Sequence, residues 1–321
     1  MKKIIKISCI FILCLNMLCI QAFGRELVAG GQVIGLSLED KTVTVAAFDN
    51  ELGTVAKNAG LQVGDRILAI DGKPICCAED IRQALHCSKG CIQMTVQRQG
   101  KKHALRAVPA ITADGPKLGV FLKQGVTGIG TVTWYDPESG SFGTLGHGVN
   151  DPAGELVKMV SGTAYRASVV GVIPGRSGKP GQLQGAVKAG EPLGRLGRNT
   201  EQGVFGTAQE GFDGKTLEVA ENEEIRTGPA VIRSTVDGTT VRDYSVEILK
   251  IYPKSGTAGR NMLLKVTDPE LLKITGGIVQ GMSGSPIIQD GKLVGAVTHV
   301  LVNQPDTGYG IFIENMLQAA G

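Results

Sequence analysis

Aromatic residues are scarce in this chain of 321 residues, where Phe, Tyr and Trp together make up 4%. Glycine, by contrast, is abundant, with 46 residues. Many turns and short strands produce such a balance, whereas long helices do not. The net charge of +3 has no concentrated basic run behind it, which argues against a nucleic-acid partner. Hydrophobic residues at 42% and charged residues at 20% are typical of a globular protein, and the length is sufficient for two domains.

Cysteine is absent after Cys91, so the remainder of the chain has no thiol nucleophile. Of the seven cysteines, three lie near the N-terminus and four cluster in one short region: Cys76, Cys77, Cys87 and Cys91. Outside the cytoplasm, one disulfide between a member of the first pair and a member of the second is compatible with this cluster. A zinc site is the alternative, but the spacing is not that of a zinc ribbon.

The N-terminus carries the features of an export signal. Met1-Lys2-Lys3 precedes an apolar stretch from Ile7 to Ile20, and the small residues around Gly24 offer a cleavage site. The apolar run is short for a membrane span and suits a secretory signal. We therefore expect residues 1–24 to be a signal peptide or a retained membrane anchor, with the rest of the chain exported in either case.

A small α+β module is expected over residues 25–108. The string from Ala59 to Pro74 carries Ala-Gly-Leu, Gly-Asp and Ile-Asp-Gly at fixed offsets. It closely resembles the signature of PDZ domains, in which a glycine loop binds the terminal carboxylate of a peptide while the peptide adds to a sheet edge. By that resemblance the loop consists of Ile34, Gly35 and Leu36, whose apolar side chains also serve the core.

The sequence beyond Gly130 consists of short β-runs, such as Thr131–Tyr135, separated by Gly, Pro and Asn-Asp. Only the stretches after Asp268 and near Ile313 look helical. Many short strands with frequent turn signals favour a β-barrel or a sandwich. Residues 109–321 are therefore assigned to a second domain that is mainly β.

The most informative segment is Gly-Met-Ser-Gly-Ser-Pro at residues 281–286. A serine hydroxyl is a weak nucleophile unless the backbone exposes it and a base takes its proton. Gly281 and Gly284 permit the sharp turn that exposes Ser283, and the N–H groups of Gly281 and Ser283 are candidates for an oxyanion hole. Ser285, with glycine on one side only, is the rival nucleophile. A plain loop between strands is the alternative, but the proline and Asp-Gly hairpin that follow are also typical of chymotrypsin-like serine proteases.

Four histidines are available as the base: His86, His103, His147 and His299. The first two belong to the PDZ-like region and are expected at its surface. His147 stands between glycines at the end of a strand-like run, an unhindered setting that suits a catalytic imidazole. His299 ends the strand after the nucleophile and is expected either to support the site from behind or to lie in the core.

A carboxylate should orient the imidazole and stabilise its charged form. Asp151 is near His147 in sequence, and Asp237, Asp243 and Asp268 are the other candidates; spacing does not choose among them. Asp268 precedes a proline, so capping the helix that follows is the alternative reading for this residue.

Four segments together resemble a single family: residues 28–32, 143–148, 275–286 and 295–300. They are similar to the SpoIVB serine peptidases of endospore-forming bacteria, and the likeness covers essentially the whole chain. It implies a chymotrypsin-like β-barrel after the PDZ domain, with His147 as base, Ser283 as nucleophile and Asp268 as acid. No metal or organic cofactor is implied.

The resemblance also implies a biological role. Members of the family are secreted from the forespore into the space between the two membranes and cleave themselves near the N-terminus. They then cut a membrane-bound inhibitor of an intramembrane metalloprotease, which leads to activation of sigma-K. The leading hypothesis is an exported serine endopeptidase that signals by limited proteolysis, with itself and a membrane-bound regulatory complex as partners. The alternatives are a PDZ peptide-binding adaptor with a silent β-domain and a general envelope quality-control protease.

Overall fold

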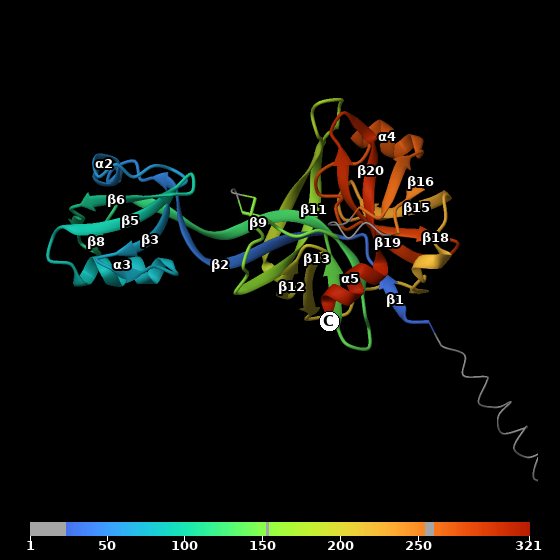
Figure 1. Cartoon of the computed structure of the whole chain (residues 1–321), viewed down its shortest axis with the longest axis horizontal. Coiled ribbons are helices and arrows are strands. Elements are labelled where there is room, and N and C mark those ends of the chain that lie inside the picture. The colour runs from blue at the N-terminus through green and yellow to red at the C-terminus, as the bar shows by residue number, and fades with distance from the viewer. Residues whose placement is uncertain (1–23, 152–153, 254–259) are drawn as a thin grey trace, which may run out of the picture.

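The computed structural model describes residues 24–151, 154–253 and 260–321. The predicted export segment lies outside this part, except for Gly24. Within the described ranges, no helix has the length and apolar character needed to cross a membrane. The chain is mainly β, as the sequence predicts, and it forms two β-barrels with a small module that stands apart from them (Figure 1).

The first barrel is a ring of six antiparallel strands. They are β2 (Val33–Phe48), β9 (Val120–Tyr135), β10 (Ser141–Thr144), β11 (Ser161–Ile173), β12 (Gln182–Thr200) and β13 (Gly203–Ala208). Pairing runs in the order β9-β10-β13-β12-β11-β2, and β2 pairs again with β9, which closes the ring. Two short strands, β1 (Glu26–Ala29) and β14 (Thr216–Glu218), extend the sheet beyond β9. Side chains such as Ile34, Val132 and Phe142 are fully buried inside.

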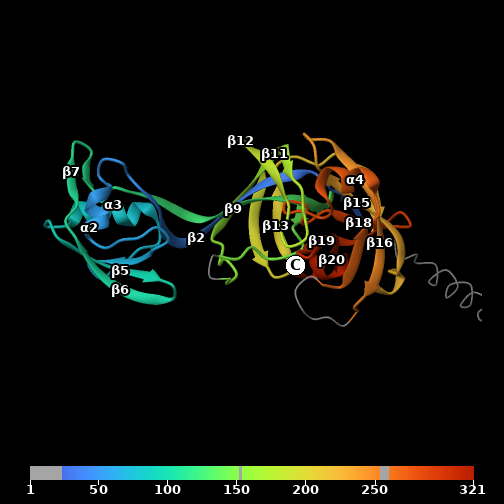
Figure 2. The ribbon, with the colours of Figure 1, turned by 90° about the horizontal axis from the view of Figure 1, so that it is seen from above.

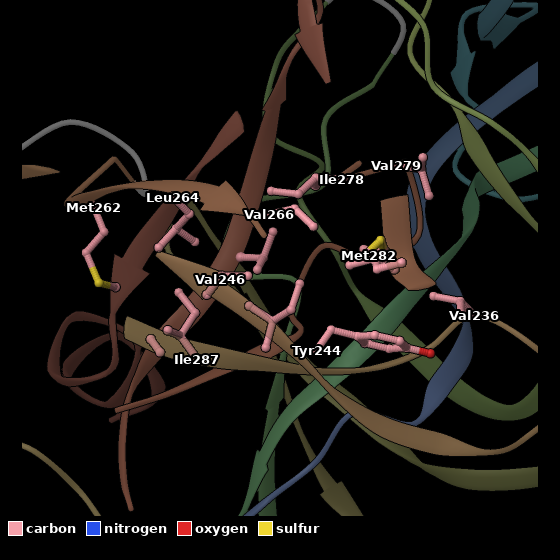
Figure 3. Packing of buried hydrophobic residues seen from close by; sticks show 14 of the residues in the cluster. Val236, Tyr244, Val246, Met262, Leu264, Val266, Ile278, Val279, Met282 and Ile287 are labelled. Carbon is pink, nitrogen blue, oxygen red and sulfur yellow. The ribbon is translucent and has the colours of Figure 1, made fainter. Parts of the chain in front are cut away.

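The second barrel is also closed by six strands. They are β15 (Gly228–Thr235), β16 (Val241–Ile251), β17 (Met262–Val266), β18 (Pro286–Gln289), β19 (Lys292–Leu301) and β20 (Gln304–Phe312). A short 3-10 helix (Asn222–Glu224) precedes them, α4 (Pro269–Thr275) follows β17, and α5 (Ile313–Ala320) ends the chain. Figure 3 shows the apolar interior of this barrel, in which Val246 and Leu264 meet side chains from the segment before Ser283.

The small module has its own sheet, helices and core. Its elements are α2 (Gly53–Asn58), β3 (Arg66–Ile70), β4 (Lys73–Pro74), α3 (Ala78–Cys87), β5 (Ile92–Arg98), β6 (Lys101–Ala107), β7 (Ala110–Thr112) and β8 (Gly115–Lys117). The Gly-Asp of its signature has a structural role: Asp65 is fully buried, caps the turn at Gln62 N and receives two hydrogen bonds of 2.7 Å from Arg98.

Two long strands connect the module to the first barrel. β2 and β9 have 16 residues each and pair from Val33 with Thr131 at the barrel end to Phe48 with Val120 at the module end. Figures 1 and 2 show them as an arm between the two parts. The PDZ-like module is therefore inserted between the first strands of the barrel. The predicted boundaries are wrong in this respect, because residues 26–38, assigned to the module, belong to the barrel.

The four cysteines of the module are free in the structure. Cys76 and Cys77 precede α3, whereas Cys87 ends it and Cys91 follows. The ten residues of α3 separate Cys77 from Cys87 by about 15 Å at 1.5 Å per residue, and a disulfide requires Cα atoms within about 7 Å. A disulfide between Cys87 and either member of the first pair is therefore excluded by the helix.

Candidate active site

The loop that carries Ser283 lies between α4 and β18. Gly281 and Gly284 adopt φ values of +97° and +95°, which only glycine takes without strain. At Gly284 a Cβ atom would also lie 2.1 Å from the carbonyl oxygen of Thr131 on β9. The two glycines that bracket the serine are therefore required by the turn and by its close approach to the first barrel.

Core packing and hydrogen bonds hold this loop from two sides. Ile278, Val279 and Met282 belong to the buried apolar cluster drawn in Figure 3, and each is at most 2% exposed. From the first barrel, the hydroxyls of the buried Thr131 and Thr133 donate to the carbonyl oxygens of Gly281 and Gly284, both at 2.8 Å. The N–H of Thr131 donates to the carbonyl oxygen of Ser283 at 3.0 Å.

Two N–H groups of this loop have no acceptor among the residues that the structure describes. The neighbouring N–H groups donate to backbone carbonyls: Gln280 to Gly181, Met282 to Val279, Gly284 to Val297 and Ser285 to Met282. Those of Gly281 and Ser283 donate to no acceptor within the described chain. A pair of oriented donors beside a serine is what an oxyanion hole requires.

The two candidate nucleophiles differ in accessibility. Ser285 is fully buried and its hydroxyl donates to the hydroxyl of Ser234 at 3.0 Å. Ser283 lines an open cavity, and its hydroxyl donates to the carbonyl oxygen of Thr298 at 2.8 Å. Only Ser283 is placed to meet a substrate.

His147 follows a left-handed turn at the end of β10. Leu145 and Gly146 have φ values of +69° and +68°, and a Cβ at Gly146 would lie 2.9 Å from the side chain of Thr298. The ring Nδ1 of His147 lies 2.8 Å from the carbonyl oxygen of Gly148. Because a carbonyl only accepts, Nδ1 carries the proton and Nε2 is left as the basic nitrogen. Burial lowers the pKa of His147, and the bond to Gly148 opposes that shift, so the ring is neutral at pH 7.

One cavity of about 440 Å³ between the barrels contains His147, Ser283 and His299. Its walls are otherwise largely apolar and come from both barrels: Leu36, Leu38, Val126, Ile129, Leu145, Val149, Ile278, Val279, Val300 and Val302. The structure thus brings together a histidine and a serine that are far apart in the sequence. Their setting is a base, a hydroxyl and two unpaired N–H donors in an apolar cleft.

Comparison with known proteins identifies the family of the chain. Residues 115–317 match the family model of the SpoIVB peptidase S55 family, and residues 51–98 match that of the PDZ domain. The chain is a member of the SpoIVB peptidase S55 family. It is accordingly a PDZ-containing peptidase, as the sequence predicts.

More distant similarities cover parts of the chain. Proteins named as zinc metalloproteases from Rhizobium meliloti and Agrobacterium fabrum are 32% and 30% identical over 38% and 44% of the chain. The chain spans about a third of their length, 31% and 37%. Among solved structures, the active form of the Rv3671c protease from M. tuberculosis has a TM-score of 0.37 at 15% identity, with 61% of this chain and 75% of that one covered. A PDZ domain of an SdrC-like protein from Listeria monocytogenes has a TM-score of 0.22 at 22% identity, with 26% and 87% covered.

Asp268 is not brought to the histidine in this S55 peptidase. It is the N-cap of α4, where its carboxylate accepts from the N–H of Leu271 at 2.9 Å and from the N–H of Ser245 at 3.3 Å. The Nδ1–H of His147 donates its hydrogen bond to the carbonyl oxygen of Gly148 instead. The prediction that Asp268 orients His147 is therefore wrong for this structure, and the capping alternative describes the residue.

The other candidate carboxylates have different surroundings. Asp243 forms two hydrogen bonds with Arg233, at 2.7 and 3.0 Å. Asp237 lines a separate cavity of about 410 Å³ beside α4. Asp151 accepts from the N–H of Glu155 at 3.0 Å.

His299 lies closer to the chemistry than the sequence indicated. Its ring centroid is 5.0 Å from that of His147, with the planes tilted by 38°. Burial, followed by the neighbouring His147 and Arg260, lowers the pKa of His299 to about 4. The available sequence signal was its place on β19, the second strand of the hairpin that follows Ser283.

The predicted carboxylate-binding loop of the PDZ domain is also wrong. Ile34, Gly35 and Leu36 lie within β2, where Gly35 pairs with Ile129 of β9 on one side and with Tyr165 of β11 on the other. A strand that is paired on both edges cannot accept a peptide. Gly35 is needed for close packing, because its Cβ would lie 2.5 Å from the Val187 side chain.

A carboxylate-binding loop needs a glycine turn beside a strand that has one unpaired edge, and a second glycine turn has both features. Gly119, between Leu118 and Val120, has φ +70°, and a Cβ there would lie 2.2 Å from the carbonyl oxygen of Leu52. The strand that it opens, residues 120–124 of β9, pairs with β2 on one edge and with no described strand on the other. Helix α3 packs close by, with His86 against Gly115.

Proposed function

We propose that this S55 peptidase is a serine endopeptidase in which Ser283 is the nucleophile and His147 the general base. The observation that carries the proposal is the cavity they share beside the two unpaired N–H groups. His147 Nε2 takes the hydroxyl proton as Ser283 Oγ attacks the substrate carbonyl carbon. The N–H groups of Gly281 and Ser283 hold the oxyanion. His147 then gives the proton to the leaving amine, and water hydrolyses the acyl-enzyme with the same base.

The carbonyl of Gly148 takes over one task usually given to a carboxylate. It fixes the tautomer of His147 that leaves Nε2 unprotonated. In the substrate-free structure the Ser283 hydroxyl donates to Thr298 rather than to His147. We infer that the hydroxyl changes rotamer when a substrate fills the cavity.

The substrate is an extended polypeptide. β18 pairs with β19 as far as Ala296, and from His299 to Leu301 the edge of β19 beside the cavity has no strand neighbour on that side within the described chain. An extended peptide placed there adds to the sheet and passes Ser283. The apolar walls of the cavity favour apolar side chains near the scissile bond.

The biological role that we propose is limited proteolysis in sporulation signalling. Family membership and the predicted N-terminal export signal support a protein secreted into the forespore intermembrane space. There it cleaves itself and then a membrane-bound inhibitor of an intramembrane metalloprotease, which activates sigma-K. The test is to express the chain in an endospore-forming host that lacks its own family member, and to measure a sigma-K reporter and the size of the inhibitor. Wild type should restore both and Ser283→Ala neither.

The same experiment separates the alternatives. Full reporter activity with Ser283→Ala would indicate a PDZ adaptor whose β-domain is silent. Restored cleavage of many unrelated envelope proteins, with no effect on the inhibitor, would indicate a general quality-control protease. No nucleic acid or cofactor enters the proposal.

The PDZ domain, in this proposal, selects the partner by binding a polypeptide C-terminus at Leu118, Gly119 and Val120. Hydrogen exchange with a peptide that has a free, apolar C-terminal residue tests this placement. The amides of residues 120–124 should gain protection, and those of Ile34 to Leu36, already paired on both sides, should not change. The amidated peptide is the control and should protect neither. Protection confined to Ile34 to Leu36 would contradict the placement.

A further inference from the structure

The ring of His299 lines the catalytic cavity beside His147, and the proposed mechanism leaves it without a role. His299 projects from β19 directly after Thr298, whose carbonyl oxygen holds the Ser283 hydroxyl. Its ring lies 5.0 Å from that of His147, centroid to centroid. The residue therefore touches both halves of the proposed catalytic pair, the base directly and the nucleophile through its chain neighbour.

The Nδ1 atom of His299 is buried and has no hydrogen-bond partner in the described chain. A buried polar atom without a partner is unfavourable for folding by about 1–3 kcal/mol, so a phenylalanine would fill this position at lower cost. A buried polar group that stays unsatisfied calls for an explanation, and a role in catalysis is one of them. In this cavity, such a role arises when the ring of His147 becomes positively charged during the reaction.

The groups around His299 keep its ring neutral. Three effects lower its pKa to about 4: burial first, then His147 from the turn after β10, then Arg260 ahead of β17. The Arg260 guanidinium itself lies over the ring of Tyr309 on β20, at 5.3 Å. At neutral pH the His299 ring is therefore uncharged and has a nitrogen lone pair, which a cation would attract.

We propose that His299 is a positioning residue for His147: its neutral ring holds the His147 ring in place, and its Nδ1 lone pair stabilises the imidazolium that forms when Ser283 loses its proton. This inference rests on the proposed serine peptidase function. It divides the usual work of a carboxylate between two groups. The carbonyl of Gly148 fixes the tautomer, and His299 stabilises the charge.

Two variants of His299 test the inference in the purified enzyme with a peptide substrate. His299→Phe keeps the ring and removes the lone pair. We expect kcat to fall by about 10²-fold, the lower end of what acid–base groups contribute, with KM changed less than twofold. The acid limb of the kcat/KM profile should move to lower pH, because the imidazolium of His147 loses a stabilising neighbour. His299→Gln supplies an acceptor again and should recover at least a tenth of wild-type kcat.

The matched control is His103→Phe on β6, an exposed residue of the PDZ domain, which should leave kcat and the pH profile unchanged. All rates are compared per folded molecule, from far-UV circular dichroism at the assay temperature. Wild-type kcat and an unmoved acid limb in His299→Phe would overturn the inference, and so would equal losses in the Phe and Gln variants. If wild type itself neither turns over peptide nor reacts at Ser283, it is the proposed peptidase function that fails.

Discussion

The hydroxyl of Thr131 donates to the carbonyl oxygen of Gly281 at 2.8 Å and thereby ties strand β9 to the nucleophile loop. Strand β9 is also the strand that reaches the PDZ domain, where its residues 120–124 form the open sheet edge. One continuous strand therefore holds the proposed oxyanion hole at one end and the proposed peptide-binding edge at the other. The position of the loop depends on the first barrel as much as on the second, to which Ser283 belongs.

Thr131→Val tests that dependence. Valine keeps the shape but leaves the buried carbonyl of Gly281 without its hydroxyl donor, which costs about 1–3 kcal/mol of stability. A displaced Gly281 N–H should also lower kcat by about tenfold, less than the loss of about 10²-fold or more when an oxyanion donor is removed. Thr127→Val, exposed on the same strand, is the control for both measurements. A destabilised Thr131→Val with unchanged kcat would show that this bond does not position the loop.

The role of Asp268 as a helix cap predicts a clear pattern of variants. Asp268→Asn keeps a good N-cap and should retain both stability and turnover, whereas Asp268→Ala should lose about 1 kcal/mol of stability. In both variants, turnover per folded molecule should stay close to wild type. Urea unfolding together with peptide hydrolysis at matched folded fraction measures the two effects. A loss of about 10⁴-fold in turnover for Asp268→Asn would instead restore this residue as the acid of a triad.

The low pKa of His299 predicts a dependence of stability on pH. Its pKa falls from 6.5 in the unfolded chain to about 4 in the fold. Between these values the unfolded state binds a proton that the folded state does not, so stability falls as pH falls through this window. The side chain is only partly buried, so solvent screening reduces the contribution to about 1–2 kcal/mol. His299→Gln should lose less stability than wild type between pH 7.5 and pH 4.5, as read from urea midpoints. Parallel curves for the two proteins would show that His299 is protonated equally in both states.

The sequence could predict those site residues whose neighbouring backbone adopts a conformation that only glycine tolerates. The turns at Gly281, Gly284 and Gly146 need left-handed or crowded backbone, so glycine stands there for a reason that is visible in the sequence. That is why Ser283 and His147 could be selected in advance. Asp268 could not be assigned, because an aspartate before a proline is equally typical of a helix cap.

The domain order was hidden for a different reason. β2 and β9 each cross from the barrel into the PDZ domain as one strand without a proline. The polar break in β2 between Leu38 and Val43, opposite Gly125, is a bulge in the strand pair and not a reversal of the chain. The boundary between the barrel and the PDZ domain is therefore the point at which these strands change their pairing partners. The sequence of a strand does not show which strands it pairs with. The same limit misplaced the peptide-binding loop: Gly35 is a close-packing glycine inside a strand, whereas Gly119 is the one that opens a turn.

The most direct test of the account is reaction of the purified protein with a fluorophosphonate probe, followed by mass spectrometry of the labelled peptide. We predict a single adduct on Ser283, lost in Ser283→Ala, strongly slowed in His147→Ala and unchanged in Ser285→Ala, since Ser285 is buried against Ser234. An adduct on Ser285, or labelling that persists in Ser283→Ala, would contradict the assignment of Ser283 as the nucleophile.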